Sequence, residues 1–184
     1  MEAVFIDKHY NLVVECKQGS TKALNSLYKL YSKAMFNIAL RILNNADEAA
    51  DVLQEAFIQA FNRINEFRQD TTFGLWIKQI VVNKAISQLR KRRFEFVSIE
   101  EINDIPDEEP IDFEEIEYQV QQVRAAILKL PDGYRVVLSL YLLEGYDHEE
   151  ISEILKISVN TSRTQFLRAK RKLVTLIKAG IFVR

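Results

Sequence analysis

The spacing of apolar residues predicts that most of the chain is helical. Between Ser20 and Asn44, apolar side chains recur every three or four residues, and Ser20 stands where a helix N-cap is expected. A second stripe of this kind runs from Ala49 to Ile64 with polar residues on its other side, so the two helices are expected to pack as antiparallel neighbours. Strand-like alternation is rare, and glycine and proline are scarce. The sequence therefore predicts an all-α fold.

Three further helices are expected from the same periodicity. One begins after Thr71 or Thr72 and ends in the basic run at residues 90–93. Another covers residues 120–130, and a third starts at Pro131 and runs to Leu143. Together these segments extend the helical pattern over both halves of the chain.

Residues 147–177 carry the pattern of a helix-turn-helix motif. Asp147 and Glu150 have the spacing of a capping box at the start of a short first helix. After a turn, Ser158 can cap a second helix over residues 159–177. Three apolar residues of the second helix are expected to face the first: Phe166, Leu173 and Ile177. In this motif the second helix enters the DNA major groove, where side chains of its early turns meet base edges.

The polar residues of the second helix have the chemistry that DNA recognition needs. Those able to meet base edges are Asn160, Thr161, Arg163, Thr164 and Gln165. Those able to meet phosphates are Arg168, Lys170, Arg171 and Lys172. The solvated face of an ordinary amphipathic helix explains the same pattern, so the motif by itself leaves both interpretations open.

The charge is divided into three blocks, although the 184-residue chain has a net charge of only -1. Residues 1–93 and residues 118–184 each carry an excess of five positive charges. Residues 94–117 contain 11 acids, no base and two of the three prolines. A run of like charges with prolines resists helix formation, so this segment is interpreted as a linker between two helical domains.

Composition excludes several classes of protein. No apolar stretch approaches the roughly 20 residues of a membrane span, and the amino terminus has an acid where a signal peptide has a base, so a cytoplasmic protein is expected. Cys16 is the single cysteine, and the two histidines lie far apart in sequence, so no metal or cofactor is predicted. A metal-dependent nuclease has little support, because the clustered acids lie in the linker without a phosphate-binding loop. No enzymatic activity is predicted.

Aromatic and amide side chains near the third helix allow two interpretations. Trp76 and Phe73, followed by the basic run, could stack bases of a single strand, but a core position is the favoured interpretation for Trp76. Phe67 and Phe73 are left open between core and DNA. Asn83 is either a buried amide with satisfied hydrogen bonds or a reader of an extruded base.

Several segments in order resemble the bacterial extracytoplasmic-function (ECF) sigma factors, which are specificity subunits of RNA polymerase. Residues 47–67 (DEAADVLQEAFIQAFNRINEF) look like the polymerase-binding helix of that family, and residues 72–93 (TFGLWIKQIVVNKAISQLRKRR) look like its minus-ten-recognition helix. Residues 130–173 look like its carboxy-terminal DNA-binding domain. The resemblance spans nearly the whole chain, and the order and separation of the segments make it specific.

The resemblance implies a region-two domain at residues 1–93 that binds core polymerase and melts the promoter minus-ten element. It also implies an acidic linker at residues 94–117 and a region-four domain at residues 118–184 that reads the minus-thirty-five element. The implied polymerase-binding residues are Asp51, Gln54 and Glu55. The expected minus-ten residues are Phe67, Arg68, Phe73, Asn83, Arg90, Arg92 and Arg93. The expected minus-thirty-five residues are Asn160, Thr161, Arg163, Thr164, Leu167, Arg168, Lys170 and Arg171.

The implied partners are the clamp helices and flap of core RNA polymerase, promoter DNA and an anti-sigma factor. An autonomous helix-turn-helix regulator, which would usually dimerise on paired half-sites, is the alternative. The sequence departs from the family at Lys156 and Asn160, where glycine is frequent, and at Ser162 and Gln165. Lys156 is expected to adopt a left-handed conformation that costs roughly 1 kcal/mol.

Overall fold

The computed structural model describes residues 7–92 and 120–179, and within these residues all regular structure is helical. The first part contains α1 (Tyr10–Lys17), α2 (Thr21–Leu43), α3 (Ala46–Asn62), the short 3-10 helix η1 (Ile64–Glu66) and α4 (Phe73–Arg92). The second part contains α5 (Val120–Leu128), α6 (Asp132–Leu142), α7 (His148–Leu155) and α8 (Val159–Lys178). The all-α prediction is confirmed. The predicted linker at residues 94–117 lies outside the described residues.

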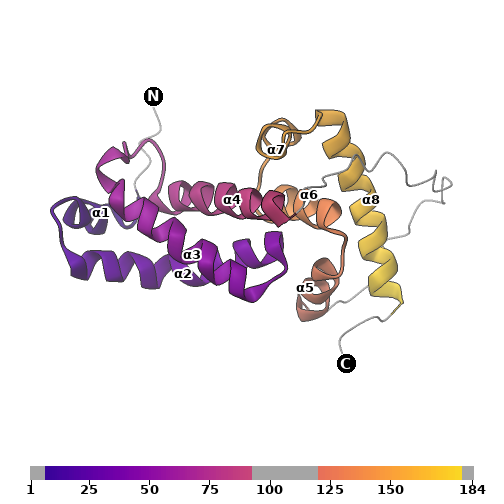
Figure 1. Cartoon of the computed structure of the whole chain (residues 1–184), viewed down its shortest axis with the longest axis horizontal. Coiled ribbons are helices and arrows are strands. Elements are labelled where there is room, and N and C mark those ends of the chain that lie inside the picture. The colour runs from indigo at the N-terminus through magenta and orange to yellow at the C-terminus, as the bar shows by residue number, and fades with distance from the viewer. Residues whose placement is uncertain (1–6, 93–119, 180–184) are drawn as a thin grey trace.

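Helices α2, α3 and α4 pack on one another and form the core of the amino-terminal part, with α1 packed against α2 (Figure 1). The predicted N-cap of α2 is confirmed, since the Ser20 hydroxyl accepts a hydrogen bond from the Ala23 N–H. The Asn45 side chain caps α3 in the same way, through the Glu48 N–H. Helix α4 begins at Phe73, as the sequence predicts.

Helices α6 and α8 form the centre of the carboxy-terminal part, and α5 and α7 pack against them. The expectation that Leu173 faces the first helix of the motif is wrong. Leu173 packs in a small cluster with Ile127, Leu130 and Leu138, because α8 is long enough to extend beyond α7 across α5 and α6. Phe166, nearer the start of α8, contacts the ring of His148 at the start of α7.

The two parts are in contact with each other through α2 against α6 and α4 against α7, a contact we call the seam (Figure 1). Val136, Val137, Leu140 and Ile151 of the second part belong to the same buried apolar cluster as the core of the first. Polar contacts add to the seam: Arg41 pairs with Glu144, and the Lys78 ammonium donates to the Glu144 carbonyl. The described helices therefore form one closed arrangement.

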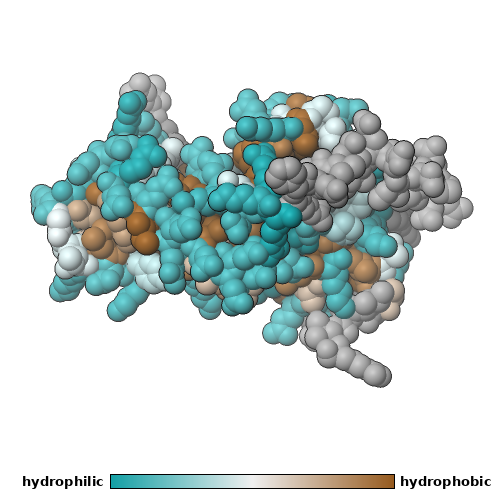
Figure 2. Space-filling view, in the orientation of Figure 1, coloured by the Kyte–Doolittle hydropathy of each residue, from teal (hydrophilic) through white to brown (hydrophobic). Residues whose placement is uncertain are grey.

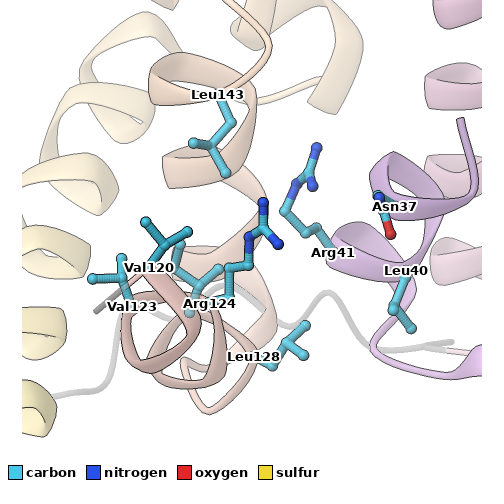
Figure 3. A pocket seen from close by; sticks show the side chains of 9 residues that line it. Asn37, Leu40, Arg41, Val120, Val123, Arg124, Leu128 and Leu143 are labelled. Carbon is cyan, nitrogen blue, oxygen red and sulfur yellow. The ribbon is translucent and has the colours of Figure 1, made fainter. Parts of the chain in front are cut away.

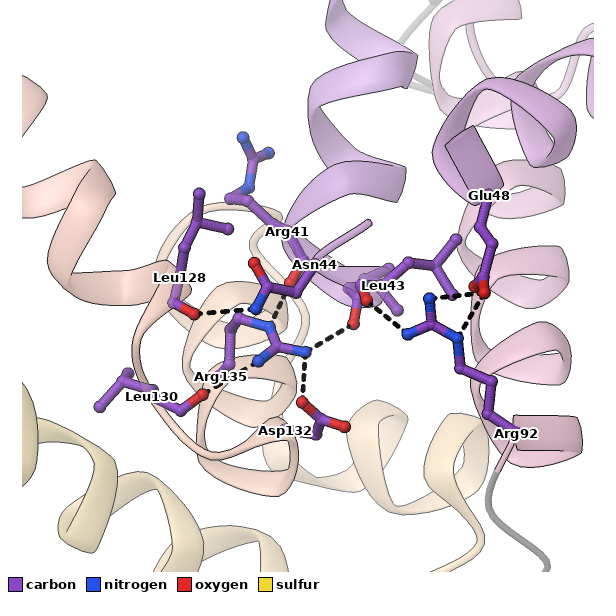
Figure 4. Close-up of polar contacts among 10 residues, drawn as sticks. Arg41, Leu43, Asn44, Glu48, Arg92, Leu128, Leu130, Asp132 and Arg135 are labelled. Carbon is purple, nitrogen blue, oxygen red and sulfur yellow. Dashed lines mark hydrogen bonds and ion pairs between the residues drawn. The ribbon is translucent and has the colours of Figure 1, made fainter. Parts of the chain in front are cut away.

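Arg135 of α6 is the most buried charged residue of the seam, with 1% of its surface exposed (Figure 4). Its guanidinium donates to the Arg41 carbonyl over 2.8 Å and to the Ile42 carbonyl over 3.2 Å, both in the last turn of α2. These carbonyls have no partner within their own helix, because a helix leaves its last four C=O groups unpaired. Arg135 of one part therefore caps a helix of the other.

The same guanidinium also bonds within the carboxy-terminal part, to the Leu130 carbonyl and, over 2.6 Å, to a carboxylate oxygen of Asp132. The next carbonyl of α2, that of Leu43, is capped by Arg92 of α4 (Figure 4). Arginines of α4 and α6 therefore both bond to carbonyls at the carboxy end of α2.

A hollow of about 530 Å³ interrupts the seam between α2, α5 and the end of α6 (Figure 3). Leu40, Val123 and Leu143 contribute apolar walls, and Arg41 and Arg124 contribute their guanidinium groups. The hollow opens to solvent, because Val120 and Leu143, which line it, are 64% and 49% exposed.

Candidate nucleic-acid interface

Asn83 is exposed on α4 and lines a shallow pocket of about 310 Å³ between α3 and α4. The interpretation of Asn83 as a buried amide is therefore wrong. The Asn83 pocket has an apolar wall from Trp76 and Ile80 and polar side chains from Gln59, Arg63, Gln79, Lys84 and Ser87. An aromatic ring, amides and cations around one hollow are the groups that bind an unstacked base and its phosphate.

The aromatic residues beside this pocket are arranged in order from the core to the surface. Phe67 and Phe73 are 4% and 0% exposed, so both belong to the core. Trp76 is half-buried and stacks on Phe67, with ring centroids 5.0 Å apart and planes 26° from parallel. Phe67 and Phe73 thus support the wall of the pocket from inside, and Trp76 is the ring that reaches it.

The loop before α4 and the basic end of α4 contain the other predicted minus-ten residues. Arg68 is exposed on the loop. Arg90 donates to the Ile154 carbonyl of α7 over 2.8 Å, across the seam, and Arg92 bonds to Glu48 and to the Leu43 carbonyl. Arg93 lies outside the described residues. Two of the predicted phosphate-binding cations are therefore already held by protein partners in the closed arrangement.

The helix-turn-helix has the predicted caps. Asp147 and Glu150 form the complete capping box of α7, and the Ser158 hydroxyl accepts from the Thr161 N–H at the start of α8. Lys156 adopts the left-handed conformation expected of it, with φ 55°. This residue occupies the turn where glycine is the favoured type, so the turn keeps its shape at a cost in backbone energy.

Buried polar and aromatic contacts fix α8 against α7 and α6. Ser162 is fully buried, and its hydroxyl lies 2.9 Å from Nδ1 of His148. His148 in turn stacks on Tyr141, with ring centroids 4.5 Å apart. Ser162, which departs from the family pattern, therefore has His148 as its polar partner. The side chain of Gln165, the other departure in this helix, packs beside Gly133 of α6.

The outer face of α8 presents most of the predicted minus-thirty-five residues. Arg163 and Leu167 are exposed, and Thr164 and Arg168 are partly exposed beside them. Arg163 lies 3.4 Å from Glu149 in an ion pair in which both side chains are more than 60% exposed. Such a pair contributes little, so Arg163 is free to exchange Glu149 for another partner. Asn160 and Lys170 are exposed, and Thr161 and Arg171 are partly exposed.

The predicted polymerase-binding residues lie on the outer side of α3. Asp51, Gln54 and Glu55 are exposed there, opposite the buried stripe that includes Ala56. Glu55 pairs with Lys84 of α4 over 3.1 Å, and Ile58 one turn farther on is 61% exposed. The surface over α3 is mostly hydrophilic, with hydrophobic residues in small separate patches (Figure 2).

Some residues of the Asn83 pocket were not among those predicted from the sequence. Gln79 and Ser87 stand four residues before and after Asn83 on α4, so helical spacing could have identified them, and Lys84 is the next residue in the sequence. Gln59 and Arg63 come from α3, and only the packing of α3 on α4 places them at the pocket. Arg63 is held there by Glu66, whose pKa is lowered by the hydrogen bond from Arg63.

Within residues 7–92 and 120–179, no cluster of three or more His, Cys, Asp or Glu residues is arranged to hold a metal ion. No helix in these ranges has the length and apolar character needed to cross a membrane.

Two protein-family models match the sequence. The Sigma-70 region 2 model matches residues 27–95, and the Sigma-70, region 4 model matches residues 120–173. The RNA polymerase sigma-H factor of Pseudomonas aeruginosa is 31% identical over 178 residues, which is 89% of this chain and 91% of that protein. The ECF RNA polymerase sigma factor SigW of Bacillus subtilis is 29% identical over 175 residues, and the match covers 88% of this chain and 92% of SigW.

A further sequence relative and two solved structures are also similar to this chain. The ECF RNA polymerase sigma-E factor of Escherichia coli K12 is 30% identical over 172 residues, covering 86% of this chain and 88% of that factor. Among solved structures, the sigma factor RpoE in complex with the anti-sigma factor NepR from Bartonella quintana gives a TM-score of 0.55 at 22% identity, over 86% of this chain and 98% of RpoE. CnrH in complex with the cytosolic domain of CnrY gives 0.54 at 22% identity, over 94% of this chain and 99% of CnrH. These two structures support the fold.

Proposed function

Because the chain belongs to the ECF class of RNA polymerase sigma factors, which direct core polymerase to promoters, we propose which surface performs each step of initiation. The Asn83 pocket holds an extruded base of the minus-ten element, α8 reads the minus-thirty-five element, and the exposed side of α3 docks on polymerase. In this proposal residues 1–93 and 118–184 are the two DNA-binding domains, and residues 94–117 link them. The relatives give no support to an autonomous regulator.

The exposure of Asn83 above Trp76 is the observation that carries the minus-ten proposal. An amide can pair with the edge of a base that has left the stack, and a half-buried indole offers a surface for stacking. Arg63 and Lys84 border the same pocket and can neutralise the phosphates on either side of that base. These interactions exist only with separated strands, so binding energy shifts the equilibrium toward the open promoter.

The minus-thirty-five proposal is supported by the exposure and chemistry of α8. Arg163 can make the two parallel hydrogen bonds that identify guanine in the major groove. Leu167 is 46% exposed on the same face, where a thymine methyl group is an apolar partner. Arg168 and Arg171, one and two turns farther along, are placed to bind the phosphate backbone and so to fix the orientation of the helix.

The proposal that α3 docks on polymerase rests on acids combined with an exposed apolar residue. Asp51 and Glu55 stand one turn apart, and Ile58 follows on the same side. An isoleucine with 61% of its surface in water gains free energy when a partner covers it, while acids at the rim select a basic partner surface. This composition suits docking on another protein rather than on DNA.

Three wider properties complete the proposal. The chain has no catalytic activity of its own and acts through the polymerase that it recruits. It works in the cytoplasm, where polymerase and chromosomal DNA are located. An anti-sigma factor holds it inactive, a proposal supported by the fold that it shares with RpoE, which was solved in complex with the anti-sigma factor NepR.

Run-off transcription with purified core polymerase tests the proposal. Genomic fragments are transcribed with and without the chain, and start sites are mapped. We expect discrete new start sites preceded by two shared sequence elements, together with co-elution of the chain and core polymerase. Absence of co-elution, or transcripts that do not depend on the chain, would overturn the proposal. Asp51→Ala with Glu55→Ala is expected to weaken co-elution, whereas Arg163→Ala is expected to leave co-elution intact and to change promoter choice.

A further inference from the structure

The loop between η1 and α4, residues 67–72, is held at both ends by the segment that contains α1. Asp7 and Lys17, at opposite ends of this segment, each bond to one end of the loop. Both residues lie outside the part of the chain that the region 2 family model matches, which begins at residue 27. The family match therefore does not account for this contact.

Asp7 caps α4 from a distant position in the chain. Its carboxylate accepts a hydrogen bond from the Phe73 N–H over 2.7 Å, at the first residue of α4, and its other oxygen accepts from the His9 N–H over 2.9 Å. A carboxylate at this place satisfies an amide that has no partner within the helix and interacts favourably with the positive end of the helix dipole. Thr72 caps the same first turn, accepting from the Leu75 N–H.

Lys17 holds the other end of the loop. Its ammonium donates to the Phe67 carbonyl over 2.8 Å and lies 6.0 Å from the centre of the Phe67 ring. Because Phe67 follows η1 directly, this contact fixes the point at which the chain enters the loop. Asp7 and Lys17 thus constrain both ends of the same loop.

The interior of the loop has little internal support. In the described part of the chain, residues 68–71 take part in no backbone hydrogen bond. Gln69 has φ 66°, a left-handed conformation that is unfavourable for a residue with a Cβ atom. The conformation of the loop therefore depends on the anchors at its ends.

A continuous series of contacts joins these anchors to the Asn83 pocket. Phe67 stacks on Trp76, and Phe73 lies 5.9 Å from Trp76 between ring centroids. Trp76 and Asn83 line the same pocket. A shift of either anchored phenylalanine must move the indole, because rings packed in a core have no free space to absorb the change.

Tyr31 connects the same segment to the start of α4. Its hydroxyl lies 2.8 Å from Nδ1 of His9, and its ring packs so closely on Gly74 that a Cβ atom there would lie 2.8 Å from the Tyr31 ring. The pKa of Tyr31 is raised by burial and, secondarily, by the charge of Asp7. Its hydroxyl thus stays neutral and available for this hydrogen bond.

We propose that Asp7 and Lys17 are positioning residues for base recognition: by anchoring both ends of the loop they hold Trp76 and Asn83 in the geometry that accepts the extruded minus-ten base. The inference rests on the proposed function of the Asn83 pocket. It predicts that loss of an anchor reduces discrimination between bases rather than binding as a whole.

The test uses holoenzyme assembled from the full chain and core polymerase. Its affinity is measured for single-stranded oligonucleotides that carry the mapped minus-ten element, with each base substituted in turn, and a duplex with only the upstream element serves as internal standard. The variants are Asp7→Ala and Lys17→Met, with Lys17→Arg as the conservative replacement. Lys8→Met is the matched control, since Lys8 is exposed and makes no hydrogen bond to the described part of the chain.

We expect Asp7→Ala and Lys17→Met each to lower the preference for the native base at one position by about three- to tenfold, which is part of the free energy that a helix cap or a charged hydrogen bond contributes. Lys17→Arg and Lys8→Met are expected to retain the wild-type preference, and all four variants to bind the upstream duplex normally. An equal loss of affinity for every oligonucleotide would overturn the inference, because that is the effect of general destabilisation.

Asn83→Ala separates the two levels of the proposal. If Asn83→Ala lowers the base preference and the two anchor variants do not, the inference fails and the function of the pocket stands. If none of the three variants alters the preference, the function of the pocket fails, and the inference fails with it. Lys17→Met provides a second anchor variant at a surface position if Asp7→Ala does not fold.

Discussion

Replacing Arg135 by methionine is expected to separate the two parts of the chain. The guanidinium of Arg135 caps the last turn of α2 through the Arg41 and Ile42 carbonyls, and it is 1% exposed (Figure 4). Methionine retains much of the side-chain length but cannot donate a hydrogen bond. In the closed arrangement of the variant, these two carbonyls would remain buried without partners.

The size of the effect follows from these two bonds. A hydrogen bond from a charged donor contributes roughly 1.5–3 kcal/mol, so losing two across the seam costs about 3–5 kcal/mol. The cost disappears when the seam opens, because water then reaches the carbonyls. At about 1.4 kcal/mol for each factor of ten, the equilibrium between closed and open forms shifts by roughly 100- to 4,000-fold toward the open form.

Energy transfer between two fluorophores measures this change directly. Cysteines introduced at the exposed positions Lys33 and Lys172 place one label on α2 and one on α8. Cys16 does not interfere, because it is buried and its pKa is raised by burial and by Glu15, which keeps the thiol protonated and unreactive at neutral pH. We expect lower transfer in Arg135→Met than in the unsubstituted chain, with helical content unchanged.

Arg124→Met is the matched control. It removes the same charge from the same side of the seam, but Arg124 is exposed and makes no hydrogen bond to α2. Transfer in this variant is expected to equal that of the unsubstituted chain. If a folded Arg135→Met chain gave unchanged transfer, the two carbonyl contacts would not be what holds the parts together, and the reasoning would be refuted.

Four other changes test separate features of the structure. Arg163→Ala should cost about 1–3 kcal/mol at one position of the upstream element and relax its specificity, measured by binding to substituted duplexes; a uniform loss would make Arg163 a phosphate contact. Asn83→Ala should slow promoter opening, followed by permanganate reactivity, more than it weakens initial binding, and the reverse order would contradict its role in the pocket. Lys156→Gly should raise the free energy of unfolding in a denaturant titration by about 1 kcal/mol, since it relieves a left-handed residue with φ 55°; a loss would show that no strain is stored there. Replacing the acids of residues 94–117 by Asn or Gln should raise the affinity of the free chain for duplex DNA at low salt, because the 11 acids of this segment can compete with DNA phosphates for the basic residues on either side of it. An unchanged affinity would exclude such competition.

Local features of the fold could be predicted because each of them depends on residues that are close together in the sequence. The caps by Ser20, Asp147 and Ser158 depend on a polar side chain two or three residues before the amide it satisfies, so spacing reveals them. The left-handed Lys156 could be expected from its place in the turn. The exposure of Asp51, Gln54 and Glu55 follows from the apolar stripe on the other side of α3.

Contacts between distant residues could not be predicted in this way. Arg135 stands among apolar neighbours in α6, and nothing within the helix shows that its partners are carbonyls more than 90 residues earlier. Asp7 caps a helix that begins 66 residues later, where no spacing rule applies. For the same reason the sequence does not decide between core and DNA for Phe67 and Phe73, since their burial depends on how α1 and α2 pack against the loop between η1 and α4.

Arg90, near the end of α4, couples the closed arrangement to DNA binding. Arg90 is predicted to bind promoter phosphates, yet its guanidinium bonds to the Ile154 carbonyl of α7 across the seam. The Arg90 side chain occupies one position at a time, so DNA that draws its guanidinium away from the Ile154 carbonyl removes a contact that keeps the seam closed. Linkage requires the reverse as well. A change that opens the seam frees Arg90, and it raises the affinity for the minus-ten strand by as much as binding of that strand favours the open form. Arg135→Met should therefore bind that strand more tightly than the unsubstituted chain, although Arg135 itself lies buried on a different helix.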